Sequence, residues 1–379
     1  MPRRASGEGS ISHRKDGRWV AVLSVPTGSG RKRHCLYAST QQEALAKLTR
    51  VRQALDQGIA PADGRLTVGE LLRRWLDDTI LPNRRPATYQ GYRVNVERHL
   101  IPRLGRVRLV HLQPPDIRKL QNDLLAQGLS PRTVQYVRTN LRSAIQQAVA
   151  DGLVARNVVD LVSAPSAERA EIHPLTPEQV AAFLESVHGD RLEALYVTAF
   201  TTGLRQSELL GLRWSDLDLD GQTLTVAKSL QRGRGVVLSE PKSRKSRRTL
   251  ALADITVSAL RANRLRQLEE KLAAGPDWHD HSLVFSTKVG TPIDHRNLTR
   301  YFQRQIAAAG LPHQRFHDAR HACATFLLAQ GVALKVIQEI LGHASIQLTA
   351  DTYAHVLPQL QRAAMGSFDR ILRPESAAS

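Results

Sequence analysis

The run Leu341-Gly-His-Ala-Ser-Ile-Gln-Leu-Thr-Ala-Asp-Thr-Tyr-Ala-His355 lies near the end of this 379-residue sequence. Gly342 is expected to end a helix, because glycine adopts the left-handed conformation that many helix C-termini require. The turn would then direct the imidazole of His343 toward a cleft. Tyr353 adds a phenol that titrates at about pH 10, so it needs cationic neighbours or a base before it can act as a nucleophile.

Two upstream motifs can supply the positive charge. His317-Asp-Ala-Arg320 places an imidazole and a guanidinium on one face of a helix. Thr201-Thr-Gly-Leu-Arg-Gln-Ser-Glu208 places Arg205 where a helix would begin, and Glu208 lies one turn further on, where it can orient the arginine. Arginine holds two phosphate oxygens at once, and histidine exchanges protons near neutral pH. Together these residues could hold and cleave a phosphodiester.

Each motif taken alone has a more ordinary explanation. His317 and His321 have the spacing of a helical zinc pair, but the residues between them include an arginine, which would repel a metal ion. An isolated Arg205–Glu208 pair is usually a surface ion pair, and an isolated Tyr353 usually packs against its own helix. The residue identities and spacings in combination favour a shared site.

Composition indicates a polyanionic partner. The net charge is +18, and nucleic acid is favoured over a membrane because no apolar run approaches the roughly 18 residues that span a bilayer. The N-terminus lacks the apolar stretch of a signal peptide, which predicts a cytoplasmic protein. Cys35 and Cys323 provide neither a disulfide framework nor a zinc cluster and are interpreted as reduced.

Residues 1–64 are predicted to form a small three-stranded sheet with one helix. Residues 19–25 and 31–37 alternate as strands do, and residues 41–57 follow a helical pattern. Arg31, Lys32 and Arg33 give this segment a basic turn suited to insertion into a DNA groove. A solvated basic hairpin explains the same pattern equally well.

Residues 65–162 are predicted to be all-helical. Thr67-Val-Gly-Glu70 forms a capping box, and Ser130-Pro131 opens a helix with one apolar stripe. Arg132, Arg138 and Arg142 flank that stripe and are candidate DNA-binding residues. A helical domain with basic faces is otherwise an ordinary helical domain.

A linker at residues 163–174 precedes a mainly helical segment at residues 175–379. Thr176-Pro177 begins its first helix. Strands are predicted at Thr223–Ser229, Val236–Leu238 and Arg248–Leu252, and Pro241–Ser246 would be a hairpin turn between the last two. The whole chain is therefore predicted to be α+β and mainly α.

These motifs together resemble the tyrosine recombinases, the phage integrase family. The matching stretches are Thr-Gly-Leu-Arg205-x-x-Glu208-Leu, His317-x-x-Arg320 and the run from Leu341 to Tyr353. Residues 88–105 also resemble the family's core-binding domain, and the likeness extends over about residues 66–360. The N-terminal segment is similar to the arm-site-binding domain of phage integrases.

The resemblance assigns roles to these residues. Arg205 and Arg320 would hold the scissile phosphate, and His343 would add a hydrogen bond. Tyr353 would attack to form a 3′-phosphotyrosyl link, while His317 would be the acid–base partner.

A lysine completes the set that the resemblance implies. Pro241-Lys242-Ser243 matches the family's mobile lysine turn, so Lys242 would protonate the leaving 5′ oxygen, with Lys245 as the alternative. Such a basic run is otherwise usually solvated. The resemblance implies no metal and no cofactor.

The resemblance also implies partners. They are double-stranded DNA at attachment sites and a homo-tetramer, in which a helix at Leu357–Leu372 docks on a neighbouring protomer. A host DNA-bending protein and an excisionase are candidate accessory partners. A membrane is not expected.

The predicted function is site-specific recombination by an integrase of a phage or integrative element. A type IB topoisomerase or a chromosome-dimer resolvase would use the same chemistry. A silenced integrase acting as a non-catalytic, DNA-binding repressor is a further alternative, although all five residues Arg205, His317, Arg320, His343 and Tyr353 are intact.

Overall fold

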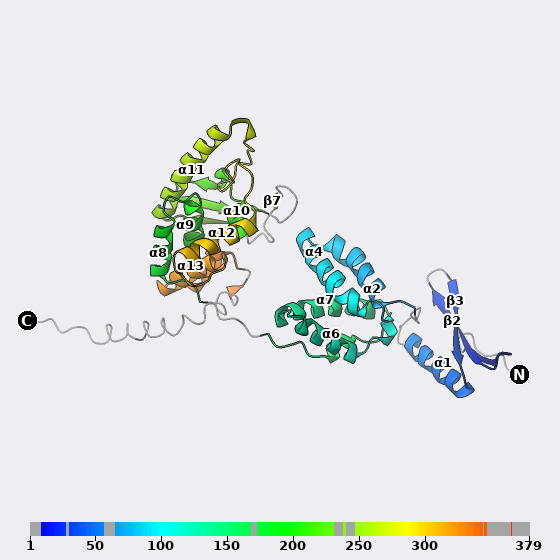
Figure 1. Ribbon diagram of the computed structural model, residues 1–379. Coiled ribbons are helices and arrows are strands. Elements are labelled where there is room, and N and C mark those ends of the chain that lie inside the picture. Colours follow the sequence, from blue (N-terminus) through cyan, green and yellow to red (C-terminus); the bar gives the residue numbers. More distant parts are fainter. Residues whose placement is uncertain are drawn as a thin grey trace, which may run out of the picture. The chain divides into compact units, whose positions relative to one another are not determined.

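The computed structural model divides into two compact units, residues 1–169 and residues 170–379 (Figure 1). It describes residues 9–27, 30–56, 65–167, 173–230, 238–239, 247–343, 345–346 and 365. The boundary between the units lies within the predicted linker. The finer division into three domains stays a prediction.

Residues 10–56 form a small antiparallel sheet and one helix. The strands β1 (Ser10–His13), β2 (Trp19–Thr27) and β3 (Gly30–Ala38) lie in the order β1-β2-β3, and α1 spans Gln41–Asp56. Alternate residues of β2, from Ala21 to Val25, are buried together with Ala44 and Leu48 of α1. This packing confirms the predicted three-stranded sheet with its helix.

Residues 68–150 form four helical rods. Two of the rods pass through a π-helical stretch: α2 (Val68–Arg74), η1 (Trp75–Ile80) and α3 (Leu81–Asn83) are continuous, as are α4 (Pro86–Asn95), η2 (Val96–Leu100) and α5 (Ile101–Leu104). The other two rods are α6 (Pro114–Ala126) and α7 (Pro131–Ala150). A short 3₁₀ turn, η3 (Leu109–His111), precedes α6, and another, η4 (Val158–Leu161), follows α7.

The predicted helix starts in this region are present. Thr67 and Glu70 form the reciprocal capping box of α2, and the hydroxyl of Ser130 accepts a hydrogen bond from the backbone N–H of Thr133 at 3.3 Å. The predicted apolar stripe of α7 is at most 1% exposed, at Val134, Val137, Leu141, Ile145 and Ala148. The region is therefore helical for the reasons that the sequence indicated.

The second unit is built around α9 (Glu193–Thr202), which is buried on most sides. It contacts α8 (Pro177–Ser186), α11 (Asp254–Ala274) and α13 (Asp318–Ala329). Two of its aromatic rings, Tyr196 and Phe200, pack with Phe183, Phe302 and Phe316 from other elements, and the centroids of the contacting rings lie 5.3 to 5.8 Å apart. The other helical elements among the described residues of this unit are α10 (Gln206–Leu210), η5 (Trp214–Asp216), η7 (Gly275–Asp277), α12 (His295–Ala308) and α14 (Leu334–Leu341).

The strands of this unit pair differently from the predicted hairpin. The predicted strand Thr223–Ser229 divides into β5 (Thr223–Val226) and β6 (Ser229–Leu230). β5 pairs with β8 (Arg248–Ala251) and with β4 (Leu217–Asp218), while β6 pairs with β7 (Leu238–Ser239). The β5–β8 pairing buries Leu224, Val226 and Leu250 on one face, which is the physical reason for this register.

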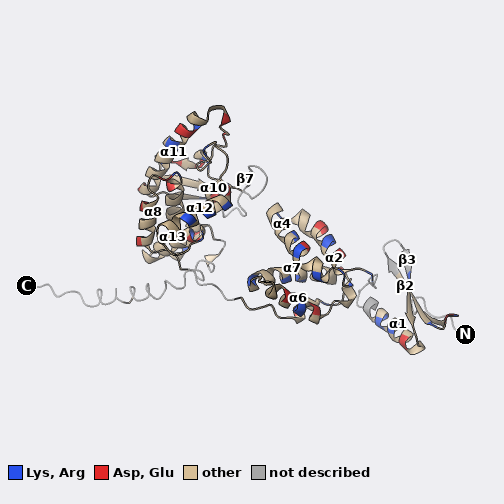
Figure 2. Ribbon diagram, viewed as in Figure 1, with Lys and Arg blue, Asp and Glu red and all other residues tan. Residues whose placement is uncertain are grey.

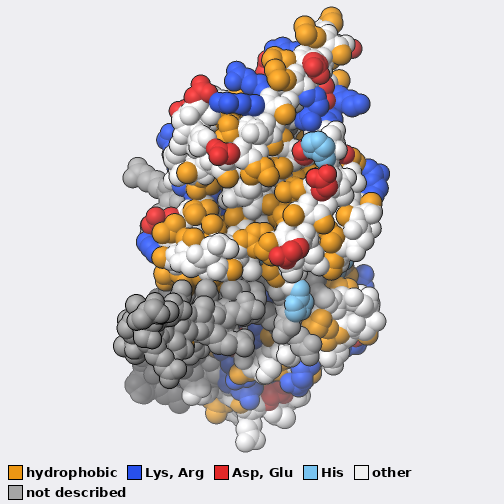
Figure 3. All heavy atoms as spheres, turned by 90° about the vertical axis from the view of Figure 1, so that its left-hand side faces the viewer, with side chains coloured by type: hydrophobic (Ala, Val, Ile, Leu, Met, Phe, Trp, Pro, Cys, Tyr) orange, Lys and Arg blue, Asp and Glu red, His pale blue; other side chains and the backbone are white. Residues whose placement is uncertain are grey.

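Charged and apolar side chains are interspersed on the surface. Lys and Arg lie on both units (Figure 2). One face of the molecule carries apolar side chains between charged ones (Figure 3). On α11, Leu265, Leu268 and Leu272 are 65%, 52% and 83% exposed. Within the described residues, no helix combines the length and the apolar character needed to cross a membrane.

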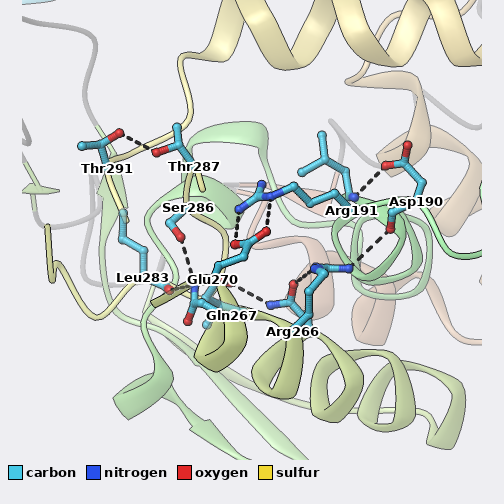
Figure 4. Close-up of polar contacts among 12 residues, drawn as sticks. Asp190, Arg191, Arg266, Gln267, Glu270, Leu283, Ser286, Thr287 and Thr291 are labelled. Carbon is cyan, nitrogen blue, oxygen red and sulfur yellow. Dashed lines mark hydrogen bonds and ion pairs between the residues drawn. The ribbon is translucent and has the colours of Figure 1, made fainter. Parts of the chain in front are cut away.

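A polar network holds α11 against the rest of the second unit (Figure 4). The guanidinium of Arg191 donates to both carboxylate oxygens of Glu270, at 2.6 and 2.7 Å. The amide of Gln267 donates to the carbonyl of Leu283 and to the hydroxyl of Ser286, both at 3.0 Å. These contacts attach one side of α11 to two loops.

Candidate active site

The C-terminal end of α14 is where the predicted residues meet. Three successive carbonyls there accept hydrogen bonds from three different arginines. The Ile340 carbonyl accepts from Arg248 at 2.6 Å, the Leu341 carbonyl from Arg320 at 2.7 Å, and the Gly342 carbonyl from Arg205 at 3.0 Å. The arginines come from three separate elements: β8, α13 and the start of α10.

Helix chemistry explains why arginines gather there. The last carbonyls of a helix have no partner within it and carry a partial negative charge. Gly342 ends α14 in the left-handed conformation, with φ of 64° and ψ of 47°, as predicted. His343 follows at once, and its backbone N–H donates to the Gln338 carbonyl at 3.0 Å. The helix end therefore fixes both the arginines and the start of the segment that leads toward Tyr353.

Arg205 is positioned by the turn between α9 and α10. Gly203 ends α9 with φ of 60°, and Arg205 is the N-cap residue of α10, as predicted. Glu208 accepts from the Arg205 guanidinium at 2.8 Å and from its backbone N–H at 3.0 Å. The Arg205 side chain is still 36% exposed, whereas that of Glu208 is 6% exposed. The buried carboxylate thus holds Arg205 on its protein-facing side, and the partly exposed arginine side chain remains accessible to an anion.

Arg320 is almost fully buried. It is 2% exposed and donates to the Gly203 carbonyl at 2.8 Å as well as to Leu341. One guanidinium therefore links the end of α9 to the end of α14. His317 is the N-cap residue of α13, so it lies one turn before Arg320 on the same helix.

The histidines near these arginines are held in their neutral form. Burial, together with the charges of Arg320 and Arg205, lowers the pKa of His343 to about 4. Surrounding protein atoms partly desolvate His317 at the surface, and this effect, with the charge of Arg320, lowers its pKa. Burial and the neighbouring His317 lower the pKa of His321 to about 4. In this form an imidazole can accept a proton or donate a hydrogen bond without adding a permanent charge to the site.

The described residues offer no third ligand to the His317–His321 pair that was considered as a zinc site. The rings of His317 and His321 stand edge to face with centroids 5.1 Å apart. The part of the chain that the structure describes contains no group of three or more His, Cys, Asp or Glu side chains placed to hold a metal ion. Cys323 is buried, and burial raises the pKa of its thiol to about 12, so it is protonated near neutral pH.

Arg248 is a member of the cluster that the sequence analysis missed. Its guanidinium donates to Glu208 at 3.1 Å, in addition to Ile340. A signal existed in the strand alternation: Arg248 shares a face with the buried Leu250 and Leu252, while Arg247 and Thr249 are exposed. Within the basic run 242–248, no residue type alone distinguishes this arginine.

Burial by itself would raise the pKa of Glu208. The charges and hydrogen bonds of Arg248, and then of Arg205, outweigh that effect and lower its pKa. Glu208 therefore remains ionised and serves two arginines.

Other predicted residues lie apart from this cluster or outside the described residues. Four predictions fall outside the residues that the structure describes: Tyr353, Lys242, Lys245 and, except for Met365, the helix at Leu357–Leu372. The side chains of Arg31 and Lys32 also fall outside them. Arg33 is exposed on β3.

The α7 arginines contact protein groups. Arg138 donates to the carbonyls of Val159 and Val162 at 2.9 and 2.7 Å, and Arg142 pairs with Asp160 at 2.5 Å. Arg132 lies over the ring of Tyr136, 5.0 Å from its centroid. Their predicted role in DNA binding stays a prediction, and Arg138 already holds the 3₁₀ turn η4 in place.

Comparisons with known proteins match both units. The family model for the phage integrase family matches residues 174–359, and that for the phage integrase N-terminal SAM-like domain matches residues 67–125. An integrase of Streptomyces ambofaciens is 32% identical over 380 residues, covering 96% of each chain. A tyrosine recombinase XerC-like protein of Caldanaerobacter subterraneus is 31% identical over 343 residues, covering 85% of this chain and 88% of the relative.

A solved structure has a similar fold. The Tn1549 transposon integrase, in complex with a circular intermediate DNA, has a TM-score of 0.70 with this chain at 25% identity. The match covers 80% of this chain and 99% of the transposon protein.

Proposed function

This chain belongs to the phage integrase family of tyrosine recombinases, and we propose that it integrates and excises a phage or other integrative element by cutting and rejoining DNA at specific sites. The observation that carries the proposal is the convergence of Arg205, Arg320 and His343 at the end of α14. Two guanidinium groups on neighbouring carbonyls form a fixed positive site for one phosphate. Tyr353 follows in sequence, ten residues after His343.

The proposed reaction is a pair of transesterifications. Arg205 and Arg320 stabilise the negative charge that grows on the non-bridging oxygens as the phosphate becomes five-coordinate. The Tyr353 oxygen bonds to phosphorus while the bond to the 5′ oxygen breaks, which leaves a 3′-phosphotyrosyl link and a 5′ hydroxyl. The 5′ hydroxyl of another strand reverses these steps and rejoins the DNA.

Proton transfers are assigned to two groups, and a hydrogen bond to a third. Neutral His317 can take up the phenolic proton, since its lowered pKa keeps it unprotonated near neutral pH. Lys242 supplies the proton to the departing 5′ oxygen. His343, neutral with a pKa of about 4, donates a hydrogen bond to the phosphate. The energy of the broken phosphodiester is retained in the covalent link, so the reaction needs no cofactor.

The proposed partner is double-stranded DNA at attachment sites, bound by a homo-tetramer in the cytoplasm. The DNA complex of the Tn1549 integrase supports the first part, and the net charge of +18 provides the electrostatic attraction. A host DNA-bending protein and an excisionase are proposed as accessory partners on the family resemblance alone.

An integrase is favoured over the two enzymes of the same chemistry. The match to the Streptomyces integrase covers 96% of this chain, so it extends into the sheet and helix that precede residue 65. We assign that segment to arm-site binding. Rapid relaxation of a supercoiled plasmid without an attachment site would instead favour a topoisomerase.

A nicked suicide substrate tests the nucleophile. Cleavage of such DNA releases a short strand that cannot return, so the covalent protein–DNA adduct accumulates and is seen on a denaturing gel. Tyr353→Phe should abolish the adduct, because it lacks the attacking oxygen, and should leave DNA affinity nearly unchanged.

Tyr301→Phe is the matched control for this test. Its hydroxyl donates to Asp190, within the same unit, and takes no part in the proposed chemistry. The control should form the adduct at the wild-type rate. An adduct in the Tyr353→Phe variant would show that the assigned nucleophile is wrong.

A further inference from the structure

Arg248 contacts two parts of the arginine cluster, the carboxylate of Glu208 and the C-terminal end of α14. Its guanidinium donates to Glu208, the carboxylate that also holds Arg205, at 3.1 Å. Its Nε donates at 2.6 Å to the Ile340 carbonyl, three residues before His343. One side chain therefore connects the residue that orients Arg205 with the helix end that precedes His343.

The side chain of Arg248 is less exposed than that of Arg205. Its side chain is 8% exposed, against 36% for Arg205. Both kinds of acceptor, a carboxylate and a helix-end carbonyl, are protein groups on different elements. An effect of Arg248 on a bound phosphate would thus be transmitted through other residues.

The close approach of Arg248 to α14 explains the need for glycine after the helix. A Cβ atom added to Gly342 would lie 2.8 Å from an Nη atom of Arg248. The positive φ of 64° also favours glycine at this position. Residue 342 thus meets two separate demands, one from its own backbone and one from Arg248.

We propose that Arg248 is a positioning residue of the recombination site, which sets the place of Arg205 relative to the end of α14 by bonding Glu208 and Ile340 at once. The proposal rests on the function proposed above. Arginine is required at position 248 because its planar guanidinium donates in two directions and so reaches acceptors on two elements. A lysine ammonium at this position would not bond both acceptors in the same geometry.

Single-turnover cleavage of the suicide substrate at saturating DNA measures the effect. Arg248→Met should slow adduct formation by ~10- to 100-fold, because the reacting groups shift relative to each other. Arg248→Lys should fall between the wild type and Arg248→Met. The Kd for an uncleaved duplex should stay within about threefold of the wild type, since the side chain is buried.

Arg191→Met provides a matched structural control. Arg191 is also a largely buried arginine that bonds a glutamate, Glu270, and its side chain is 25% exposed. Its loss should lower the thermal unfolding midpoint much as Arg248→Met does, yet leave the cleavage rate of the folded protein unchanged.

A neutral phosphate analogue distinguishes positioning from a general folding defect. A methylphosphonate at the scissile position lacks the negative charge that Arg205 and Arg320 neutralise. A displacement of Arg205 should therefore reduce the cleavage rate less on this substrate than on the natural phosphate. The defect of Arg248→Met should shrink to roughly threefold or less on this substrate. A folding defect would slow both substrates equally.

Several results would overturn the proposal. They are a wild-type cleavage rate in Arg248→Met, a rate defect no larger than that of Arg191→Met, or an equal defect on the neutral substrate. Should Arg248→Met fail to fold, Arg248→Lys retains the charge beside Glu208, and a wild-type rate in that variant contradicts the proposal. Absence of an adduct with the wild-type protein would instead reject the proposed function itself.

Discussion

Two places in the described part of the second unit pair an arginine with a mostly buried glutamate, and they differ in the other contacts of the arginines. At α11, Arg191 holds both oxygens of Glu270 at 2.6 and 2.7 Å (Figure 4). At α10, Glu208 holds Arg205 and Arg248, and each of these arginines also bonds a carbonyl at the end of α14.

This difference shows that a buried ion pair does not by itself identify a reactive site. The Arg191–Glu270 pair fastens a helix to a loop, and its partners satisfy each other. The Glu208 carboxylate instead accepts hydrogen bonds from two arginines, and the side chain of one of them, Arg205, is 36% exposed. The place that we propose as reactive is the one where two arginines share one carboxylate and where one of them, Arg205, still reaches the surface.

The largest expected effect compares Arg320→Met with Arg191→Met. Arg320 donates to Gly203 and Leu341 and belongs to the proposed phosphate clamp. Its loss should reduce adduct formation by ~100- to 1000-fold, as loss of a charge-stabilising donor does. Arg191→Met should cost a few kcal/mol of unfolding free energy, about 3, without changing the rate. Single-turnover kinetics and chemical denaturation measure the two quantities.

Equal cleavage defects in these two variants would contradict the view that the arginines at the end of α14 act in cleavage while the Arg191–Glu270 pair only stabilises the fold. The rates should be compared at a temperature where both variants are fully folded.

A smaller effect is expected from a pair of glycines. Gly342→Ala adds a Cβ atom 2.8 Å from the Arg248 guanidinium and places alanine at φ of 64°. Gly331→Ala meets the same backbone strain at φ of 76°, with no atom within 4 Å of its Cβ. Both should lose about 1 to 2 kcal/mol of unfolding free energy from strain.

Only Gly342→Ala should also slow cleavage, by roughly tenfold, because it displaces the arginine. Parallel melting curves and suicide-substrate assays measure these changes. Similar cleavage rates for the two alanine variants would show that contact with Arg248 has no role in the reaction.

The effect that is smallest for each step in the varied condition, here one pH unit, is a dependence of stability on pH that belongs to the arginine cluster. Burial holds the pKa of His343 and His321 at about 4, below the ordinary value of 6.5. Between these limits the unfolded chain binds more protons than the folded chain, so unfolding free energy falls as the pH falls. Each histidine contributes at most about 1.4 kcal/mol per pH unit.

Denaturation between pH 7 and pH 4 tests this slope, and His343→Gln should reduce it. As a control, the difference in unfolding free energy between the wild type and Arg191→Met should stay constant across this pH range. An unchanged slope in His343→Gln would contradict the assigned cause.

Local sequence chemistry predicted the helix boundaries well. Thr67, Ser130 and Thr176 cap the helices that they were expected to begin, and Gly203 and Gly342 end theirs. Each of these features depends on a few neighbouring residues, so the sequence suffices. The strand pairing in residues 217–251 was predicted wrongly, because the partner of β8 is chosen by a shared buried face and not by the shortest turn.

The site shows the same division. Residue types and spacings, together with the family resemblance, predicted a site made of Arg205, Glu208, His317, Arg320, His343 and Tyr353. The structure places Arg205, Glu208 and Arg320 at the end of α14, next to His343, while Tyr353 lies outside the described residues. Arg248 was missed because its importance comes from acceptors 40 and 92 residues away. Likewise, Arg138 looks like any exposed basic residue until Val159 and Val162 are placed beside it.

The sequence alone determined the helices, their ends, the excess of positive charge and the order of the reactive groups, since these follow from local backbone preferences and side-chain chemistry. Only the tertiary structure decided that three arginines would share the end of α14 and that Glu208 would serve two of them. The reason is that hydrogen bonds between distant elements depend on packing, and packing is a property of the whole folded unit.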